Sequence, residues 1–217
     1  VIAHGDGRTS SLWDPVPISK AASAVEHRLD EGGETSHFCV MERGGGVVSM
    51  TQSIERTYGC KAACEKTGIL FNGYLKTFKV ENRSHPYFLK PGRRARSNAA
   101  PTILFEKDDP FLAIGSTGSE RMLSSIYQVL TRLRWGEAPF HAVCAPRLHC
   151  TPSGCVHLEE ERFSPTALRM LERAGLTLQP WSSPWAFEAG GLHLALRRDG
   201  LLQGVAEPRR DGGVAAL

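Results

Sequence analysis

The stretch Glu31-Gly32-Gly33-Glu34-Thr35-Ser36-His37-Phe38 decides the fold, because a glycine pair closes one segment and an alternating strand starts directly after it. A threonine at such a strand start can act as a nucleophile once the peptide bond before it is cut. Its own α-amino group then serves as the base for its hydroxyl. Thr35 is therefore the first candidate for a catalytic residue.

Composition describes an ordinary globular protein. The 217 residues include 41% hydrophobic and 23% charged residues, enough for one substantial domain or two small ones. A net charge of +3 with scattered basic residues argues against a nucleic-acid partner. No apolar run approaches the roughly 20 residues that a membrane-spanning helix needs. The compartment stays open.

Periodicity and turn residues divide the chain into short elements. Residues 1–15 and the polar segment 76–98 are expected to be irregular, and 54–68 is expected to be a loop. Helical spacing is found over 18–29, 120–133 and 165–174. Strands are predicted over 35–42, 47–53, 101–106, 111–114, 192–196 and 201–205, with turns at 44–46, 108–110 and 199–200. From Thr35 onward the order predicts one α/β unit of strands stacked with helices.

The segment Gly115-Ser116-Thr117-Gly118-Ser119 leads from an apolar strand into a helix. Free backbone N–H groups at such a helix start can hold a phosphate, a carboxylate or the oxyanion of an acyl-transfer intermediate. No Lys-Ser or Lys-Thr follows the glycines, so the segment fits no Walker motif. The alternative is a tight strand-to-helix connection without a ligand.

Several short motifs occur in a specific order along the chain. They are Thr35-Ser36-His37, Ser53, and the segments 68–72, 97–103, 115–121, 145–147 and 204–210. This order resembles the small, catalytic subunit of the γ-glutamyltransferase (γ-glutamyltranspeptidase) family over about residues 35–213.

The resemblance implies an α+β fold, the four-layer αββα sandwich of N-terminal-nucleophile (Ntn) hydrolases, of which this chain supplies the small-subunit half. It also implies a precursor that cleaves itself between Glu34 and Thr35. Residues 1–34 would then be the tail of the large subunit or an uncleaved arm, and residues 35–217 the small subunit. The large subunit of the same precursor is the expected partner.

The resemblance also assigns roles to individual residues. Thr35 is the expected nucleophile, and Ser53 matches the hydroxyl residue that hydrogen-bonds it. The backbone amides of Gly118 and Ser119 match the glycine pair that forms the oxyanion hole. Ser119 replaces the second glycine, which is tolerable because the group used is the N–H.

The positions that bind the glutamyl donor in the family are occupied differently here. Glu55 stands for an Asn, Tyr74 for a Gln and Thr77 for an Asp. The serine pair is Ser97-Asn98. The loss of the Asp matters most, because a desolvated ammonium group needs a carboxylate partner. Intact nucleophile machinery with a changed binding shell predicts an altered substrate.

The expected function is an acyltransferase or hydrolase without a cofactor or metal. Thr35 would take the acyl group of a small-molecule or peptide-like amide, and water or an amine would accept it. Two alternatives stay open. One is a homologue of specialised metabolism that hydrolyses a C–C bond next to a carbonyl, and the other is an uncleaved, non-catalytic binding scaffold.

Other chemistry-bearing residues have simpler explanations. His37 lies on the same strand face as Thr35 and is expected to be structural. Cys150, Cys155 and His157, with His149, have only loose metal-ligand spacing. Cys60 and Cys64 are expected to form a disulfide or to line a loop. The cluster of Arg93, Arg94 and Arg96 is expected to lie in a solvated loop or to capture an acidic substrate group. Trp181 and Trp185 are expected to form a packed aromatic turn.

Overall fold

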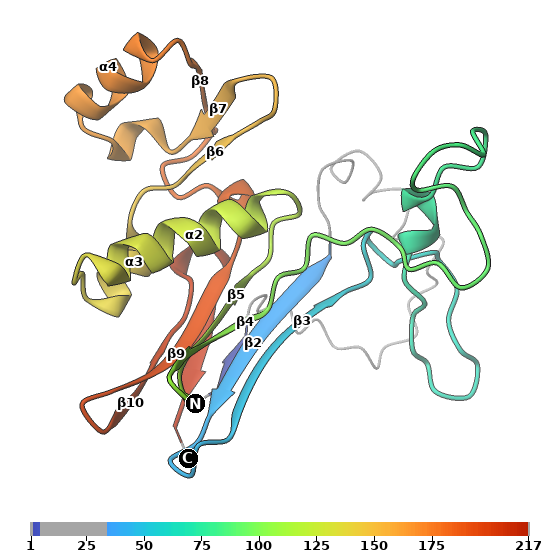
Figure 1. Cartoon of the computed structure of the whole chain (residues 1–217), viewed down its shortest axis with the longest axis horizontal. Coiled ribbons are helices and arrows are strands. Elements are labelled where there is room, and N and C mark those ends of the chain that lie inside the picture. The colour runs from blue at the N-terminus through green and yellow to red at the C-terminus, as the bar shows by residue number, and fades with distance from the viewer. Residues whose placement is uncertain (1, 5–33, 217) are drawn as a thin grey trace. The chain divides into compact units, whose positions relative to one another are not determined.

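The computed structural model describes residues 2–4 and 34–216, which form two compact units (Figure 1). The first unit contains the first strand together with Ser36–Thr51 and residues 99–216. The second contains Glu34, Thr35 and residues 52–98. The helix predicted over 18–29 lies outside the described residues.

The predicted hairpin after Gly33 is present. Its strands are β2 (Thr35–Met41) and β3 (Val47–Ser53), and Glu42 and Gly46 close the turn through a backbone hydrogen bond of 3.0 Å. Two short strands, β1 (Ile2–His4) and β11 (Gly213–Ala215), extend this sheet in the order β11-β1-β2-β3. The expectation of a loop over 1–15 is therefore wrong for its first residues.

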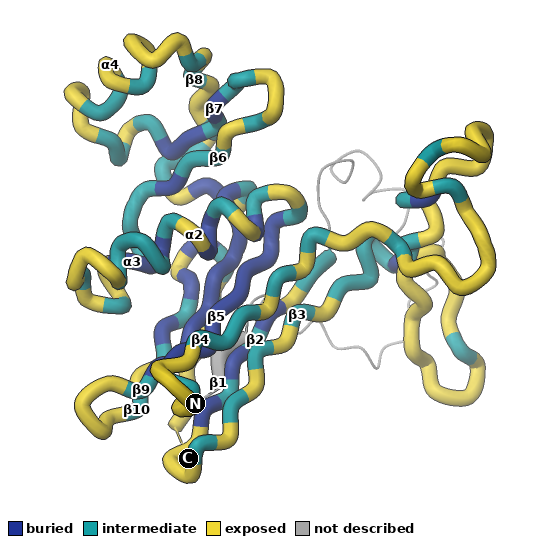
Figure 2. Tube along the Cα trace, in the orientation of Figure 1, coloured by how far each residue is buried: buried dark blue, intermediate teal, exposed yellow. Residues whose placement is uncertain are grey.

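A second four-stranded sheet has the order β10-β9-β5-β4. Its central strands are the most buried among the described strands, because both of their faces are covered (Figure 2). All neighbouring strands in it run antiparallel. The strands are β4 (Thr102–Glu106), β5 (Asp109–Ser116), β9 (Leu192–Arg198) and β10 (Leu201–Val205).

The two sheets pack face to face within the first unit. Their small interface cluster contains Cys39 and Met41 from one sheet and Ala113 and Ala195 from the other. Small side chains at β5 and β9 let the sheets approach closely. Ser49 of β3 adds a hydrogen bond of 3.0 Å from its Oγ to the Ile114 carbonyl oxygen of β5.

Helices α2 (Arg121–Arg134) and α3 (Pro139–Cys144) cover the other face of the second sheet. Residues Ile126 and Val129 of α2 and Val143 of α3 face the buried leucines of β5 and β9. This periodic apolar face is what makes the segment a helix with one buried side. The first unit thus has a layer of helices, then a sheet, then a sheet, as the α+β prediction requires.

A small three-stranded sheet, β6 (Leu148–Cys150), β7 (Cys155–Leu158) and β8 (Thr177–Pro180), follows the helical layer along the chain. Its connection contains α4 (Pro165–Arg173), which begins where predicted. The Ser164 hydroxyl accepts a hydrogen bond of 3.2 Å from the Ala167 N–H and so caps this helix.

The second unit consists mostly of turns, as expected for 54–68 and 76–98. Its one described helical turn is the 3₁₀ helix η2 (Tyr74–Thr77). The segment around it is tied by backbone hydrogen bonds, including Cys60 N–H to the Phe71 carbonyl oxygen at 3.0 Å. Gly59 must be a glycine, because its φ is +56° and a Cβ would lie 2.0 Å from that same oxygen.

One predicted turn is misplaced. Asp109 and Pro110 were expected in the turn between two strands, but they begin β5. The chain reverses at Lys107 instead, which adopts a left-handed φ of +57°. A register shift between Leu104 and Phe105 accommodates Pro110, which cannot donate to the strand ladder.

The remaining sequence expectations concern cysteines and membranes. All six cysteines are free thiols, so Cys60 and Cys64 are not joined. Within the described residues, none of the helices is both long and apolar enough to cross a lipid bilayer.

Candidate active site

The open end of the β2–β3 hairpin brings two hydroxyl groups together. Thr35 is the first residue of β2 and Ser53 the last of β3. The Thr35 Oγ1 donates a hydrogen bond of 3.0 Å to the Ser53 Oγ. Both residues belong to the second unit. The contact that the resemblance implied is therefore present.

The Ser53 hydroxyl continues this chain of hydrogen bonds. It donates to the carbonyl oxygen of Glu34 at 3.0 Å and accepts from the backbone N–H of Glu55 at 3.0 Å. With Thr35 donating to it, Ser53 has one donated and two accepted hydrogen bonds. Its hydroxyl is thus fixed in direction, with the proton toward Glu34.

The peptide bond between Glu34 and Thr35 is held from several sides. Its carbonyl oxygen accepts a second hydrogen bond, from the Ile54 N–H at 3.1 Å. The Glu34 side chain is also held, because its Oε1 accepts a hydrogen bond of 3.2 Å from Thr57. Two donors on one carbonyl oxygen polarise that carbonyl and are placed to stabilise negative charge on it.

The predicted donor-binding residues all lie in the second unit. Tyr74 and Thr77 sit at the two ends of η2, and the Thr77 Oγ1 donates to the Tyr74 carbonyl oxygen at 2.8 Å. The Tyr74 hydroxyl lies 3.5 Å from the Ser97 Oγ. Asn98 is half-buried next to Ser97 in the chain. The structure therefore brings Tyr74, Thr77 and Ser97 together.

Glu55 has a partner that the sequence did not reveal. Its Oε1 forms an ion pair of 2.6 Å with the Nζ of Lys76, a residue of η2. The Gly73 N–H donates to the Ile54 carbonyl oxygen at 2.9 Å, which holds the start of η2 beside Glu55. Because 21 positions in an irregular segment separate the two charges, sequence spacing carries no signal for this pair.

The turn between β5 and α2 in the first unit contains two backbone N–H groups, of buried Gly118 and half-buried Ser119. Gly118 and Ser119 have left-handed φ values of +111° and +55°. Neither of their N–H groups donates a hydrogen bond to another described residue. Free N–H groups at the start of α2 are suited to binding an anion or an oxyanion.

Gly118 is required by the space around it as well as by its φ. A Cβ there would lie 2.9 Å from the Cα of Gly190. The neighbouring Thr117 ties the two segments together. Its N–H donates to the Gly191 carbonyl oxygen at 2.8 Å, and its Oγ1 accepts from the Gly191 N–H at 2.9 Å.

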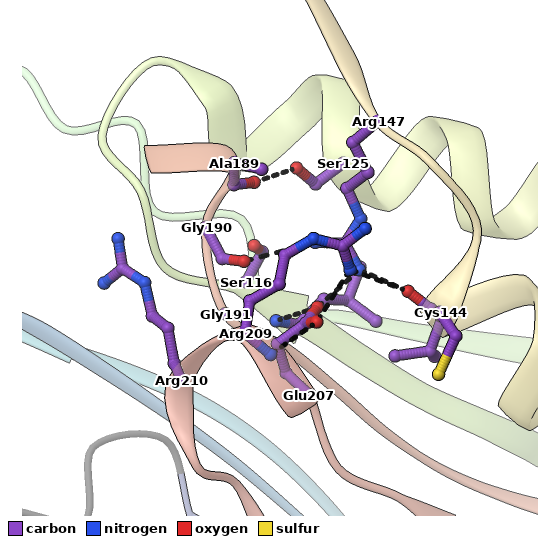
Figure 3. A network of polar contacts seen from close by, with 12 residues as sticks. Ser116, Ser125, Cys144, Arg147, Ala189, Gly190, Gly191, Glu207, Arg209 and Arg210 are labelled. Atoms are coloured by element: carbon purple, nitrogen blue, oxygen red, sulfur yellow. Dashed lines mark hydrogen bonds and ion pairs between the residues drawn. The ribbon is translucent and has the colours of Figure 1, made fainter. Parts of the chain in front are cut away.

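A buried network of charges holds the Gly190–Leu192 segment (Figure 3). Arg147 donates to the Gly190 carbonyl oxygen at 3.2 Å and forms an ion pair of 2.5 Å with Glu207. The Leu192 N–H donates to the same Glu207 carboxylate at 3.3 Å. Burial lowers the pKa of Arg147, and the Glu207 carboxylate opposes this shift.

Arg209 extends the network to Glu159. Its guanidinium lies 2.8 Å from Glu207 and 2.6 Å from Glu159, and both carboxylates are fully buried. A carboxylate oxygen of Glu159 accepts a hydrogen bond of 3.0 Å from the Ala186 N–H. The network therefore links both sides of the segment that packs on the glycine turn. In the sequence, Arg147 and Glu207 are recognisable only as members of the segments 145–147 and 204–210.

His37 is enclosed in the interior of the first unit. Its Nδ1 lies 2.8 Å from the Thr51 Oγ1 and its Nε2 lies 3.1 Å from the Cys39 Sγ. Burial, with a smaller contribution from His193, lowers the pKa of His37 to about 3. Burial raises the pKa of Cys39 to about 12. Both side chains are neutral near pH 7, which supports the structural role expected for His37.

The remaining candidate residues have ordinary packing roles. Cys155 and His157 lie 4.0 Å apart between Sγ and Nε2, while His149 bonds Ser124. The described residues contain no group of three or more His, Cys, Asp or Glu side chains that could hold a metal ion. The two tryptophans pack within the first unit, with His157 stacked on Trp181 and Arg162 over Trp185, and Arg93, Arg94 and Arg96 are exposed.

The γ-glutamyltranspeptidase family model matches residues 7–217 of this chain, nearly its whole length. The chain belongs to the γ-glutamyltranspeptidase family. It is 26% identical over 203 residues to glutathione hydrolase proenzyme 1 of Schizosaccharomyces pombe. That alignment covers 88% of this chain and 32% of the relative, so the chain spans about a third of the length of this γ-glutamyltranspeptidase relative.

Solved structures have the same fold. The γ-glutamyltranspeptidase of Pseudomonas nitroreducens, solved with L-DON, superposes with a TM-score of 0.71 at 23% identity. The match covers 83% of this chain and 98% of that one. The cephalosporin acylase of Bacillus halodurans has a TM-score of 0.74 at 25% identity, over 91% of this chain and 38% of that one. The predicted small-subunit half of an Ntn-hydrolase is confirmed as the fold.

Proposed function

We propose that this chain carries the catalytic residues of a self-cleaving hydrolase or acyltransferase with Thr35 as its nucleophile. The observation that carries the proposal is the hydrogen-bond chain from Thr35 through Ser53 to the Glu34 carbonyl oxygen. Thr35, Ser53 and the Glu34 carbonyl group lie within hydrogen-bond distance of one another, which supports their proposed roles as nucleophile, hydroxyl partner and cleavage site.

Self-cleavage starts with attack of the Thr35 Oγ1 on the carbonyl carbon of Glu34. The Ser53 hydroxyl and the Ile54 N–H donate to the carbonyl oxygen as it becomes negative. As the C–N bond breaks, the proton lost by Oγ1 passes to the Thr35 nitrogen, which leaves as an amine while Glu34 is held as an ester on Oγ1. Water hydrolyses the ester, which releases a Glu34 carboxylate and a free Thr35 hydroxyl.

Turnover uses the same oxygen on an external amide. The free α-amino group of Thr35 takes the hydroxyl proton as Oγ1 attacks the donor carbonyl, and passes it to the leaving amine. Water or an acceptor amine then attacks the acyl-enzyme and releases the product. The unpaired N–H groups of Gly118 and Ser119 are the proposed donors to the oxyanion, and their lack of described partners supports this role.

The donor is proposed to be an amide with a γ-glutamyl-like or altered acyl group. Glu55, Tyr74, Thr77, Ser97 and Asn98 would contact it, and the similarity to both a glutathione hydrolase and an acylase supports an acyl group of this class. The other two thirds of the relatives' length supports a large partner chain from the same precursor. Autoprocessing would then produce a heterodimer.

The test is an intact-mass measurement of the precursor that contains this chain. The wild type should split into two chains, one of which begins at Thr35. The Thr35→Ala variant should stay whole, because the attacking oxygen is gone. Thr67→Ala, which removes an exposed hydroxyl in the same unit, is the matched control and should split like the wild type. A wild type that stays whole would favour the binding scaffold.

A further inference from the structure

The ion pair between Glu55 and Lys76 lies one hydrogen bond away from the nucleophile pair. The Glu55 backbone N–H donates to the Ser53 Oγ, which accepts from Thr35. The Glu55 carboxylate in turn lies 2.6 Å from the Lys76 ammonium. All these residues belong to the second unit, so the charges are fixed within the unit that holds Thr35.

The local backbone is shaped to hold this carboxylate. Glu55 adopts a left-handed φ of +76°, which costs free energy for a residue with a side chain. Gly73 leaves room for it, because a Cβ on Gly73 would lie 3.3 Å from the Glu55 Oε2. Only 17% of the Glu55 side chain is exposed, against 40% for Lys76. The carboxylate lies inside, and the ammonium lies toward solvent.

The negative charge of Glu55 is already compensated by neighbouring positive side chains. Lys76 neutralises Glu55, and the Arg56 Nε lies 3.9 Å from the Glu55 Oε2 as a second positive group. The described Glu55–Arg56–Lys76 cluster therefore carries a net charge of about +1. At the Asp-like position, the Thr77 hydroxyl donates its proton to the Tyr74 carbonyl oxygen and, being uncharged, supplies no counter-charge for an ammonium group. The one carboxylate among these side chains is thus already paired in charge with Lys76, although its Oε2 accepts no hydrogen bond from the described residues.

We propose that Lys76 determines donor specificity by neutralising Glu55. The site then prefers an acyl donor with a carboxylate but no amino group beside it, the amide of a plain dicarboxylic acid. An α-amino donor such as a γ-glutamyl amide is disfavoured, since its ammonium meets net positive charge. This inference rests on the proposed function and names the substrate class for the same site.

Two chromogenic amides test the inference because they differ by one amino group. These are glutaryl-p-nitroanilide and γ-glutamyl-p-nitroanilide, assayed with the self-processed protein and its partner chain. The wild type should have the larger kcat/KM for the glutaryl amide. Lys76→Met, which keeps side-chain length, should shift the kcat/KM ratio toward the γ-glutamyl amide by about tenfold, the effect of one partly buried charge.

Matched variants separate this effect from a general change of charge. Lys79→Met removes a positive charge from an exposed residue three positions away and should leave the ratio unchanged. Lys76→Arg keeps the positive charge and should also leave the kcat/KM ratio unchanged. If the Lys76→Met precursor does not cleave itself, Lys76→Gln takes its place in the test. Adding Glu55→Gln to Lys76→Met should abolish the shift toward the γ-glutamyl amide, because the Glu55 carboxylate freed by Lys76→Met is the group that attracts the donor's ammonium.

The outcomes distinguish this inference from the proposed function. A wild type that turns over either amide while Lys76→Met leaves the ratio unchanged would overturn the role of Lys76 alone. An equal shift in Lys79→Met would do the same. A protein that neither cleaves itself, by intact mass of the same samples, nor releases nitroaniline from either amide would overturn both.

Discussion

Two sites in the molecule offer different kinds of hydrogen-bonding group. One is the hairpin end at Thr35 and Ser53, and the other is the turn at Gly118 and Ser119. At the hairpin end the groups are side-chain hydroxyls in direct contact, in a unit made mostly of turns. At the turn the groups are backbone N–H donors, held by a neighbouring segment that a buried charge network fixes. The first site depends on which side chains stand at Thr35 and Ser53. The second depends on distant residues that hold the backbone of the turn in place.

The largest expected effect comes from breaking the support of the turn. Glu207→Gln leaves the buried guanidinium groups of Arg147 and Arg209 without a full counter-charge. We expect the free energy of unfolding to fall by about 3–5 kcal/mol, as for other broken buried ion pairs. Urea unfolding measures it. Glu137→Gln, which breaks the half-exposed pair with Arg132, should cost less than about 1 kcal/mol. Equal losses would contradict the account.

A change in the turn itself should reduce activity more than stability. Gly118→Ala places a methyl group 2.9 Å from the Cα of Gly190 and strains a φ of +111°. Displaced N–H donors should lower kcat by about 10²–10³-fold, the range seen for the loss of an oxyanion donor. Steady-state kinetics measures this. Gly136→Ala has a similar positive φ of +87° but open space, and it should keep kcat within a few-fold.

At the hairpin end, Ser53→Ala should slow both self-cleavage and turnover. It removes the acceptor of the Thr35 hydroxyl and one of the two donors to the Glu34 carbonyl oxygen. A loss of about 10²-fold is expected for such a positioned hydroxyl. The half-time of precursor splitting and kcat give the two readouts. Ser49→Ala, which loses a hydroxyl hydrogen bond on the same strand, should split at the wild-type rate.

The smallest effect concerns the buried part of the hairpin strand. The folded protein holds His37 neutral down to a pKa of about 3, against 6.5 for an ordinary histidine. Between these values only the unfolded chain binds the proton. Stability therefore falls as pH decreases through this window, by up to about 1.4 kcal/mol per pH unit. His37→Gln should show a shallower slope of unfolding free energy from pH 6.5 to 4.5. Equal slopes of unfolding free energy against pH for the wild type and His37→Gln would contradict this prediction.

Sequence reasoning succeeded where the determining signal is local. Alternation predicts the hairpin, the 3.6-residue period predicts α2, and Ser164-Pro165 marks the start of α4. Gly118 is recognisable because a strand-to-helix turn needs a residue that accepts positive φ. The short strands β6 to β8 escaped prediction because segments of three or four residues show no period.

Contacts between distant positions could not be predicted in the same way. Glu159 and Arg209 meet across 50 positions, and the chain between them carries several elements. Lys76 reaches Glu55 from within an irregular segment that has no periodicity. Sequence order and family resemblance predict Thr35 and Ser53 as partners, whereas the Glu55–Lys76 ion pair is visible only in the folded chain.

The most direct test of the central claim is to locate the acyl group during turnover. The self-processed protein is mixed with an excess of a slowly hydrolysed amide donor, quenched in acid, digested and analysed by mass. The account predicts the added acyl mass on the peptide that begins at Thr35, and its absence from that peptide in a sample without donor. Acylation of any other residue, or consumption of the donor without an acylated Thr35 peptide, would contradict it.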